Sequence, residues 1–197
     1  EKIQASIKRV LDTARAANDL GAYSITYHAA FYLGNSSSDV TKKMIERHEI
    51  ITKTLEEENI SVWVRPETTG KRSQWGTLEE IVELSKHFSK VLPCVDFAHI
   101  HARENGKFNT YDEFCSILEY IGQELGEIAL NNFHGHVAGI KYTDKGEKNH
   151  LIFEESDFNY KDLLKALKSF DVKGALTCES PNIEIDTKIL KEFYNTL

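Results

Sequence analysis

The residues of this sequence that are able to do chemistry fall at the ends of its apolar, β-rich runs. Each run ends in a side chain that can ligate metal: His28, Glu67, Asp96, either of His134 and His136, and Glu179. Imidazole nitrogen and carboxylate oxygen suit zinc or manganese, and a carboxylate can bridge two ions. Two ions about 3.5–4 Å apart can stabilise both the attacking and the leaving oxygen of a phosphoryl displacement. The complete set therefore predicts a metal centre, although no two of these residues alone would be specific evidence for one.

The distribution of the histidines supports this interpretation. Of eight histidines, His48 and His87 fall in predicted helices, whereas the other six fall at strand ends or in the loops that follow them. A carboxylate such as Asp96, directly after the apolar run 91–95, would be costly to bury without a partner. Taken singly, His28 could be a buried, hydrogen-bonded histidine and Asp96 a helix cap, but as a series these residues favour ligation.

The elements that must position these side chains alternate along the chain. Amphipathic spacing predicts a helix up to about Leu20 and further helices over about 39–58, 77–90, 111–126, 160–170 and 186–194. Strands are expected at 22–28, 60–65, 91–96, 128–137 and 174–179, and polar loops at 101–109 and 141–156. This alternation predicts a parallel sheet with helices outside it. In barrels built from such units, active residues lie at the carboxyl ends of the strands, where this sequence has its candidate ligands.

Composition places the chain among globular proteins. Of its 197 residues, 41% are hydrophobic and 28% are charged, which excludes a fibrous, collagen-like or disordered chain. No apolar run reaches about 18 residues, so no membrane-spanning helix and no membrane partner are predicted. The three cysteines, Cys94, Cys115 and Cys178, are odd in number and far apart. They predict no disulfide framework and no CxxC metal site, and we expect a reducing, cytoplasmic setting.

Charge bears on the choice of substrate. The net charge of −7 disfavours neutralisation of a nucleic-acid backbone by lysine and arginine, but it permits a phosphate site whose positive charge comes from metal. Several basic residues follow the candidate ligands and either contact phosphate or are simply solvated: Lys71, Arg72, His101 and Arg103.

Four motifs give the sequence a resemblance to a known family. In chain order they are Tyr27-His28, Arg65-Pro-Glu-Thr-Thr-Gly70, Cys94-Val-Asp-Phe-Ala-His99 and Gly146-Glu-Lys-Asn-His150. In this series the chain resembles the endonuclease IV family of apurinic/apyrimidinic endonucleases, a branch of the xylose isomerase-like barrels, from its first helix to Ser180. The resemblance implies a (β/α)₈ TIM barrel of the α/β class. It also implies a DNA-repair hydrolase that binds up to three Zn²⁺ ions and cleaves phosphodiester bonds at abasic sites.

The resemblance also implies roles for individual residues at the first two ions. Glu67 would bridge them, with His28 on the first ion. Asp96, His134 and Glu179 would complete the second ion. The predicted catalytic residues are the three carboxylates Glu67, Asp96 and Glu179, and Mn²⁺ is the alternative to Zn²⁺.

Two positions depart from the family pattern. His99 and His150 would hold the third ion with a carboxylate that the family places two residues before its histidine, where this chain has Lys148. The nearest acid is Glu147, which we expect to take that place. The strand that carries His134 has a second histidine, His136, which would lie on the same strand face and could substitute for it.

A complete barrel of this kind needs about 250 residues, and five βα units are predicted here. We therefore expect residues 1–197 to form one barrel domain whose N-terminal βα units would precede Glu1, in a protein that is a monomer. The expected partner is DNA containing abasic sites. Two alternatives remain: a non-catalytic homologue, or a single-metal isomerase or epimerase acting on a small sugar. Glu67, Asp96, His134 and Glu179 satisfy the ligand pattern of such a sugar enzyme equally well.

Overall fold

Five parallel strands lie side by side in chain order. In the computed structural model, which describes residues 1–197, β1 (Ser24–Tyr27) pairs with β3 (Trp63–Pro66). β5 (Val95–Asp96) pairs with β6 (Phe133–Val137), which pairs in turn with β9 (Gly174–Cys178). Parallel bridges from Val64 to Val91 and from Glu67 to Cys94 join β3 to the segment that ends in β5. The strand order is therefore β1-β3-β5-β6-β9, and all five carboxyl ends meet at one edge.

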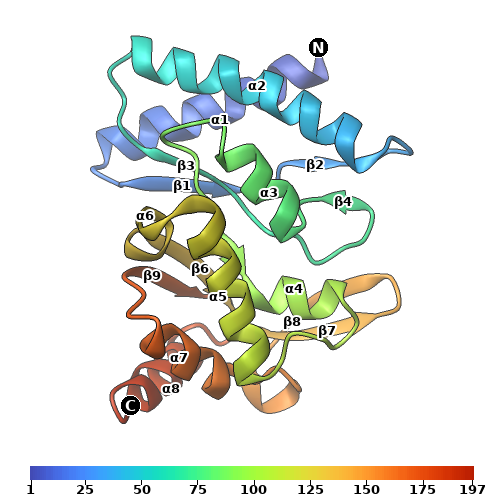
Figure 1. The fold of residues 1–197 in the computed structure, drawn as a ribbon, viewed down its shortest axis with the longest axis vertical. Helices are drawn as coiled ribbons and strands as arrows, with labels where there is room; N and C mark the ends of the chain where they lie inside the picture. Colours follow the sequence, from blue (N-terminus) through green and yellow to red (C-terminus); the bar gives the residue numbers. More distant parts are fainter.

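Helices connect these strands and cover the outer side of the array (Figure 1). α1 (Lys2–Asp19) precedes β1, and α8 (Glu184–Tyr194) follows β9. The connecting helices are α2 (Ser37–Glu57), α3 (Leu78–Ser85), α5 (Tyr111–Leu125) and α7 (Tyr160–Ser169). Side chains of Ser36, Thr77 and Thr110 accept first-turn N–H groups and so begin α2, α3 and α5. The parallel sheet with outer helices that the sequence predicts is confirmed.

Three predicted segments differ from the structure. The expected strand 128–137 begins as a short helix, α6 (Glu127–Asn131), and only its second half is β6. The expected polar loop after His101 is partly helical, because α4 (Phe97–Arg103) starts directly after Asp96, whose side chain caps it. The expected loop 141–156 contains an antiparallel hairpin, β7 (Gly139–Thr143) and β8 (Gly146–Leu151), followed by the 3₁₀ helix η1 (Phe153–Glu155). A smaller antiparallel pair joins β2 (Ala30–Phe31) to β4 (Gln74–Trp75).

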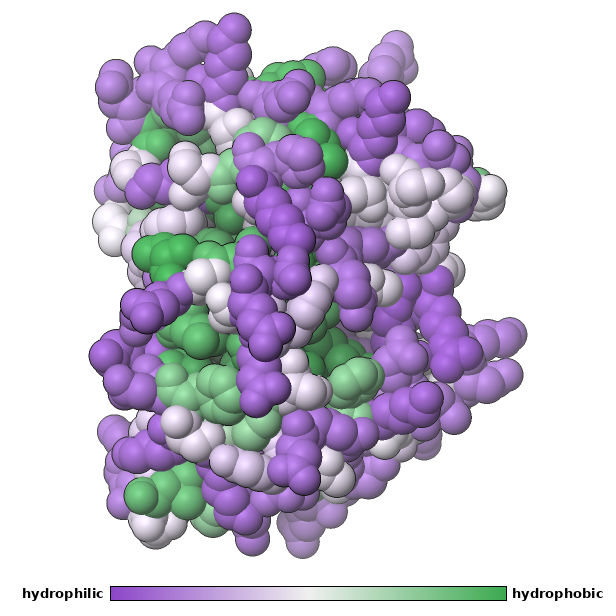
Figure 2. Space-filling view, viewed as in Figure 1, coloured by the Kyte–Doolittle hydropathy of each residue, from purple (hydrophilic) through white to green (hydrophobic).

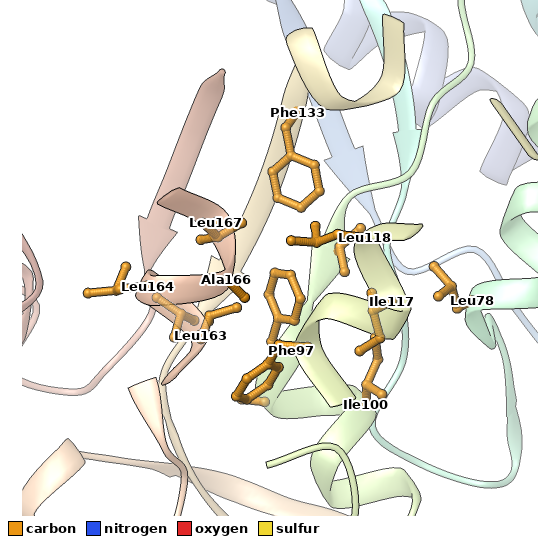
Figure 3. Packing of buried hydrophobic residues seen from close by; sticks show 14 of the residues in the cluster. Leu78, Phe97, Ile100, Ile117, Leu118, Phe133, Leu163, Leu164, Ala166 and Leu167 are labelled. Atoms are coloured by element: carbon orange, nitrogen blue, oxygen red, sulfur yellow. The ribbon is translucent and has the colours of Figure 1, made fainter. Parts of the chain in front are cut away.

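Two hydrophobic clusters support the array. The larger, of 24 buried residues, lies between the strands β5 and β6 and the helices α4, α5 and α7 (Figure 3). Its centre is Phe97, whose ring lies 5.9 Å from that of Phe114 and 6.1 Å from that of Phe133. The smaller cluster, of 14 buried residues, packs α1 and α2 against β1 and β3. Because Phe97 directly follows Asp96, the larger cluster anchors the strand end that carries this carboxylate.

The outer surface is mostly polar. Hydrophilic residues cover most of the face shown in Figure 2, and hydrophobic residues reach that surface in separate patches. No helix combines the length and the apolar character needed to cross a membrane.

The array is curved rather than flat. Ser24, at the start of β1, lies with its Oγ 3.1 Å from Nδ1 of His134 on β6, although two strands separate β1 from β6 in the pairing order. Side chains on the inner face of the array therefore converge.

Candidate metal centre

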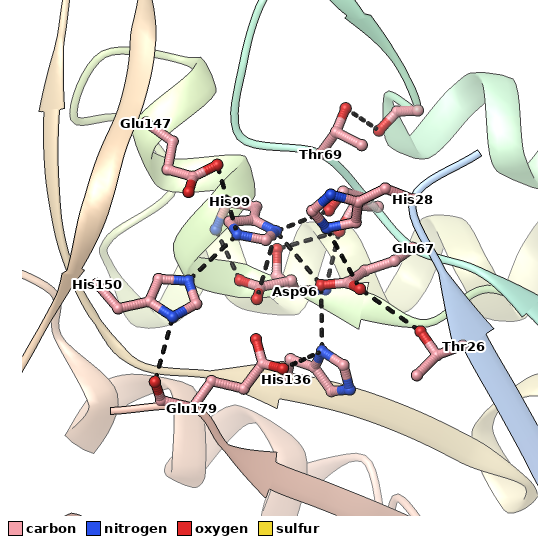
Figure 4. A network of polar contacts seen from close by, with 12 residues as sticks. Thr26, His28, Glu67, Thr69, Asp96, His99, His136, Glu147, His150 and Glu179 are labelled. Atoms are coloured by element: carbon pink, nitrogen blue, oxygen red, sulfur yellow. Dashed lines mark hydrogen bonds and ion pairs between the residues drawn. The ribbon is translucent and has the colours of Figure 1, made fainter. Parts of the chain in front are cut away.

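Four side chains converge where the parallel strands end. Glu67 follows β3, Asp96 ends β5, His136 lies in β6 and Glu179 follows β9, and one donor atom from each lies within 4.8 Å of all the others (Figure 4). Backbone hydrogen bonds between neighbouring strands continue past the strand ends and fix the backbone of Glu67 and of Glu179. The N–H of Glu67 donates to the Tyr27 carbonyl at 3.0 Å, and the N–H of Glu179 donates to the Val137 carbonyl at 2.9 Å.

Asp96 is the most enclosed member of this group. The residue is fully buried, and its Oδ1 accepts the N–H of His99 at 2.7 Å. The hydroxyl of Thr68 accepts the N–H of Asp96 at 2.8 Å, which fixes the backbone. The other carboxylate oxygen, Oδ2, is buried without a hydrogen bond and lies 3.4 Å from Nδ1 of His99. Burial raises the pKa of Asp96, and a buried carboxylate oxygen without a hydrogen bond is the feature that a bound cation would satisfy.

Glu67 contacts histidines on three sides. Its Oε1 lies 3.1 Å from Nδ1 of His136 and 3.4 Å from Nδ1 of His99, and its Oε2 lies 3.4 Å from Nε2 of His28. Burial alone would raise the pKa of Glu67, but hydrogen bonds from His136, then from His28 and His99, hold it well below its ordinary value. Glu67 is therefore an anion with both oxygens directed at possible metal sites.

His136 and Glu179 complete the group from the other side. Nδ1 of His136 lies 3.4 Å from Oε1 of Glu179. Burial would lower the pKa of His136, yet its contacts with Cys94, Glu179 and Glu67 raise it far above the ordinary range. The hydrogen bond from His136 lowers the pKa of Glu179, and about a third of the Glu179 side chain is exposed, so this carboxylate is open to solvent. Three carboxylates and one imidazole are a donor set that suits a divalent cation.

A second donor group adjoins the first through His99. Nδ1 of His99 lies 3.0 Å from the Thr68 carbonyl, and Nδ1 of His150 lies 3.1 Å from the Glu179 carbonyl. With both Nδ1 atoms acting as donors, the two Nε2 atoms face each other at 3.3 Å and need a proton or another cation between them. Burial would lower the pKa of His99, but the surrounding carboxylates, Asp96 first, raise it to about 10. Asp96, His99 and His150 can thus hold a metal together.

The remaining predicted ligands lie at the rim of this site. His28, half-exposed, forms a third possible metal group with Glu67 and His99. Oε2 of Glu147 lies 3.7 Å from Nε2 of His99, and this approach comes from the hairpin, because the N–H of Glu147 donates to the Gly70 carbonyl at 2.8 Å. The structure therefore brings His28, Glu147 and His150 to the same centre as the carboxylates.

His134 is the exception among the predicted ligands. The structure places His136, not His134, beside the carboxylates, and the pairing register explains why. His136 pairs with Asp96, at the level where the strands end, whereas His134 lies two residues earlier and pairs with Ala175. Burial and the neighbouring His136 lower the pKa of His134 to about 4, and its Nδ1 contacts the Ser24 hydroxyl instead.

Sequence reasoning also missed two residues that shape the site. Thr68 binds the backbone of Asp96 and accepts the Nδ1 hydrogen bond of His99 with its own carbonyl. Gly70 makes room for the hairpin: a Cβ at this position would lie 2.6 Å from Cβ of Glu147 and 3.1 Å from Cδ2 of His99. The signal for both was present, because both belong to the motif that contains Glu67.

Three basic residues near the site contact backbone carbonyls of the protein. The buried Arg103 donates to the Lys71 carbonyl at 2.6 Å and to the Thr69 hydroxyl at 3.0 Å. Arg72 donates to the Arg103 carbonyl at 2.9 Å, and His101 lies 2.8 Å from the Lys107 carbonyl. The buried Arg103 and His101 therefore fix the loops around the site, whereas Arg72 is exposed and contacts the protein through its Nε.

The fold and the site define a βα-barrel protein with side-chain clusters that can hold metal. The chain belongs to the xylose isomerase-like TIM barrel family, whose model matches residues 1–194. The fold predicted from the sequence, a TIM barrel of which this chain has five βα units, is confirmed. The narrower assignment to endonuclease IV stays a prediction.

One protein is similar to this chain in sequence, and several solved structures are similar to it in fold. The uncharacterized protein MJ0133 of Methanocaldococcus jannaschii is 41% identical over 197 residues, which is 100% of this chain and 71% of that protein. A D-tagatose 3-epimerase-like protein superposes with a TM-score of 0.74 at 18% identity, over 98% of this chain and 70% of the other. The 3-keto-D-glucoside 4-epimerase YcjR of E. coli superposes with a TM-score of 0.68 at 16% identity, over 97% and 70%. The probable 3-DHS dehydratase AsbF of Bacillus anthracis gives 0.61 at 16% identity, over 100% and 70%.

Proposed function

We propose that this protein is a metal-dependent isomerase or epimerase that acts on a small sugar. The observation that carries the proposal is the group Glu67, Asp96, His136 and Glu179, in which one buried Asp96 oxygen accepts no hydrogen bond. These four side chains lie at successive strand ends and can together ligate a single metal ion. Similarity in fold to two proteins described as epimerases supports the same reaction class, in place of the DNA-repair hydrolase that the sequence motifs favour.

The donor group suggests how the reaction would be divided among its residues. A divalent ion held by the four side chains, with Mn²⁺ or Zn²⁺ as the candidates, would polarise a substrate carbonyl and make the neighbouring C–H bond more acidic. Glu179 is anionic and partly open to solvent, so it would remove this proton. Glu67 approaches from another strand, and after taking a proton from the adjacent His99, whose pKa is raised to about 10, it would return this proton to the opposite face of the same carbon. Asp96 is buried and would act only as a ligand.

The direct test is proton exchange at the reacting carbon. The full-length protein, stripped with a chelator and reloaded with Mn²⁺, Co²⁺ or Zn²⁺, would be incubated in D₂O with a set of ketohexoses and ketopentoses. Metal-dependent deuterium uptake, abolished by Glu179→Gln and retained by Glu155→Gln at an exposed position, is expected. Absence of exchange with every sugar and every metal would refute the proposal.

A second function is favoured by one specific observation. The facing Nε2 atoms of His99 and His150, with Glu147 beside them, add donors that a single-ion reaction does not need. A second and a third ion at these donors and at His28 would suit phosphodiester hydrolysis at abasic sites in DNA. The acidic net charge and the internal hydrogen bonds of Arg103 count against a nucleic-acid substrate.

The two functions are separated by His150→Ala. If one ion suffices, this variant keeps the sugar exchange and its metal content. If the zinc-loaded protein cleaves an abasic-site duplex and His150→Ala removes both the cleavage and one ion, the hydrolase is the function. Elemental analysis of the same samples counts the ions directly.

A further inference from the structure

A group of nitrogen and sulfur donors lies beneath the carboxylates. One donor atom from each of Cys94, His134 and His136 lies within 4.8 Å of the other two. Cys94 is fully buried, His136 is buried and His134 is half-buried. The structure places His136, not His134, beside the carboxylates, so neither proposed reaction uses Cys94 or His134 and this group is unexplained by them.

The three side chains are held by the backbone of the array. The N–H of Cys94 donates to the Pro66 carbonyl at 3.0 Å, and its carbonyl accepts the N–H of Thr68 at 3.0 Å. Cys94 therefore sits between the two residues that flank Glu67. His134 and His136 lie two residues apart on one strand face, with their ring centroids 5.3 Å apart. The donors converge without any rearrangement of the strands.

We propose that Cys94, His134 and His136 form a separate binding site for a soft divalent cation such as Cd²⁺ or Zn²⁺. Thiolate and imidazole donors select such ions, whereas the oxygen-rich group above them suits harder ions such as Mn²⁺. On binding, the Sγ–H bond of Cys94 breaks, an Sγ–metal bond forms and the proton leaves to solvent, with no change of oxidation state. Water would complete a tetrahedral arrangement.

The position of this site has a consequence for the carboxylate centre. His136 belongs to both donor groups, and its Nδ1 lies 3.1 Å from Oε1 of Glu67. A soft ion bound below therefore competes for His136 with an ion bound above. Cd²⁺ should weaken Mn²⁺ binding in the wild-type protein, and this competition should depend on Cys94. The inference does not depend on which reaction the carboxylate centre performs.

The experiment is a Cd²⁺ titration of the metal-free, full-length protein, followed by the ultraviolet charge-transfer band of a cadmium–thiolate bond. We expect about one equivalent of Cd²⁺ to produce the band, as one donor group predicts. Cys94→Ser should abolish it. Cys178→Ser and Cys115→Ser should retain it, because neither cysteine lies near a histidine pair. A band that survives in Cys94→Ser, or that never forms in wild type, overturns the proposal.

A second variant keeps the test valid if Cys94→Ser does not fold. His134→Ala keeps the thiol and removes one nitrogen, so it should weaken Cd²⁺ binding about tenfold or more, while Mn²⁺ affinity stays at the wild-type value. Equal Cd²⁺ affinity in His134→Ala and wild type would also overturn the proposal. Because both readouts are metal affinities, failure of the sugar reaction leaves this test unaffected.

Discussion

Asp96→Asn should stabilise the metal-free protein while it weakens the response to metal. Asp96 is fully buried, and its Oδ2 has no hydrogen-bond partner. An unsatisfied buried polar group costs about 1–3 kcal/mol, and more when it is charged. Asparagine keeps the oxygen that accepts the N–H of His99 and removes the charge. Since 1 kcal/mol corresponds to about 2–4 °C in a chain of this length, the Tm without metal should rise by about 2–12 °C.

Bound metal should stabilise the Asp96→Asn variant less than it stabilises the wild-type protein. An ion at about 1,000 times its Kd stabilises a protein by about 4.1 kcal/mol, and an affinity about 100-fold weaker leaves about 1.4 kcal/mol of this. The stabilisation by Mn²⁺ should therefore shrink by about 2.7 kcal/mol, or about 5–11 °C in Tm. Calorimetry with and without Mn²⁺ measures both effects, with Asp19→Asn on the exposed end of α1 as the matched control. The reasoning would be refuted by an Asp96→Asn protein that is less stable than wild type without metal and yet shows the same rise in Tm on addition of Mn²⁺.

Three further outcomes follow from single contacts. His48 is buried and burial lowers its pKa from 6.5 to about 4, so the stability is complete above pH 6.5 and falls by about 3 kcal/mol as the pH approaches 4. Urea unfolding should show this loss in wild type and not in His48→Gln. Gly70→Ala, whose Cβ would lie 2.6 Å from Cβ of Glu147, should cost about 1–3 kcal/mol in the same assay, and an unchanged stability would contradict the observed packing. In calorimetric titrations His136→Ala should lower Mn²⁺ affinity about 100-fold and His134→Ala should not, whereas the reverse result would return His134 to the centre.

The strand ends were predictable because two independent signals coincide there. An apolar run such as 91–95 predicts a buried strand, and a carboxylate directly after it needs a partner that the run itself does not provide. In a parallel array all such ends meet at one edge, so Glu67, Asp96 and Glu179 had to converge wherever the helices ran. The convergence of the carboxylates required no knowledge of the loops.

The missed elements lack such a signal. The run from Ile128 to Val137 begins with three apolar residues and is then interrupted by Asn131 and Asn132, and three apolar residues alone do not separate a short helix from the start of a strand. Gly126 ends α5 with a φ of 76°, and the chain then makes the short helix α6 before it enters the sheet. In the hairpin after β6, Ile140 and Tyr142 alternate with polar residues, but this alternation is short and β8 is polar up to Leu151, so the sequence predicts a loop. The turn of the hairpin depends on Gly146 at a φ of 94°.

The choice between His134 and His136 could not be made from the sequence because both lie on the same strand face. Residues two apart differ in height by about 6.6 Å along the strand, yet the long side chains still bring a donor atom of each histidine within 4.8 Å of the other. Spacing within one strand therefore does not tell which histidine joins the carboxylates. The pairing of His136 with Asp96 decides which, and that register is a property of two strands rather than of one.

The overlap of the donor groups explains why the reaction is harder to predict than the fold. Glu67 belongs both to the carboxylate group and to the group with His28, and Asp96 belongs both to the carboxylate group and to the group with His99 and His150. A carboxylate with two free oxygens can serve one ion or bridge two. The same shared residues therefore fit a one-ion sugar enzyme and a multi-ion hydrolase. Residues that belong to one group only distinguish them, and His150, carried by the hairpin rather than by a barrel strand, is such a residue.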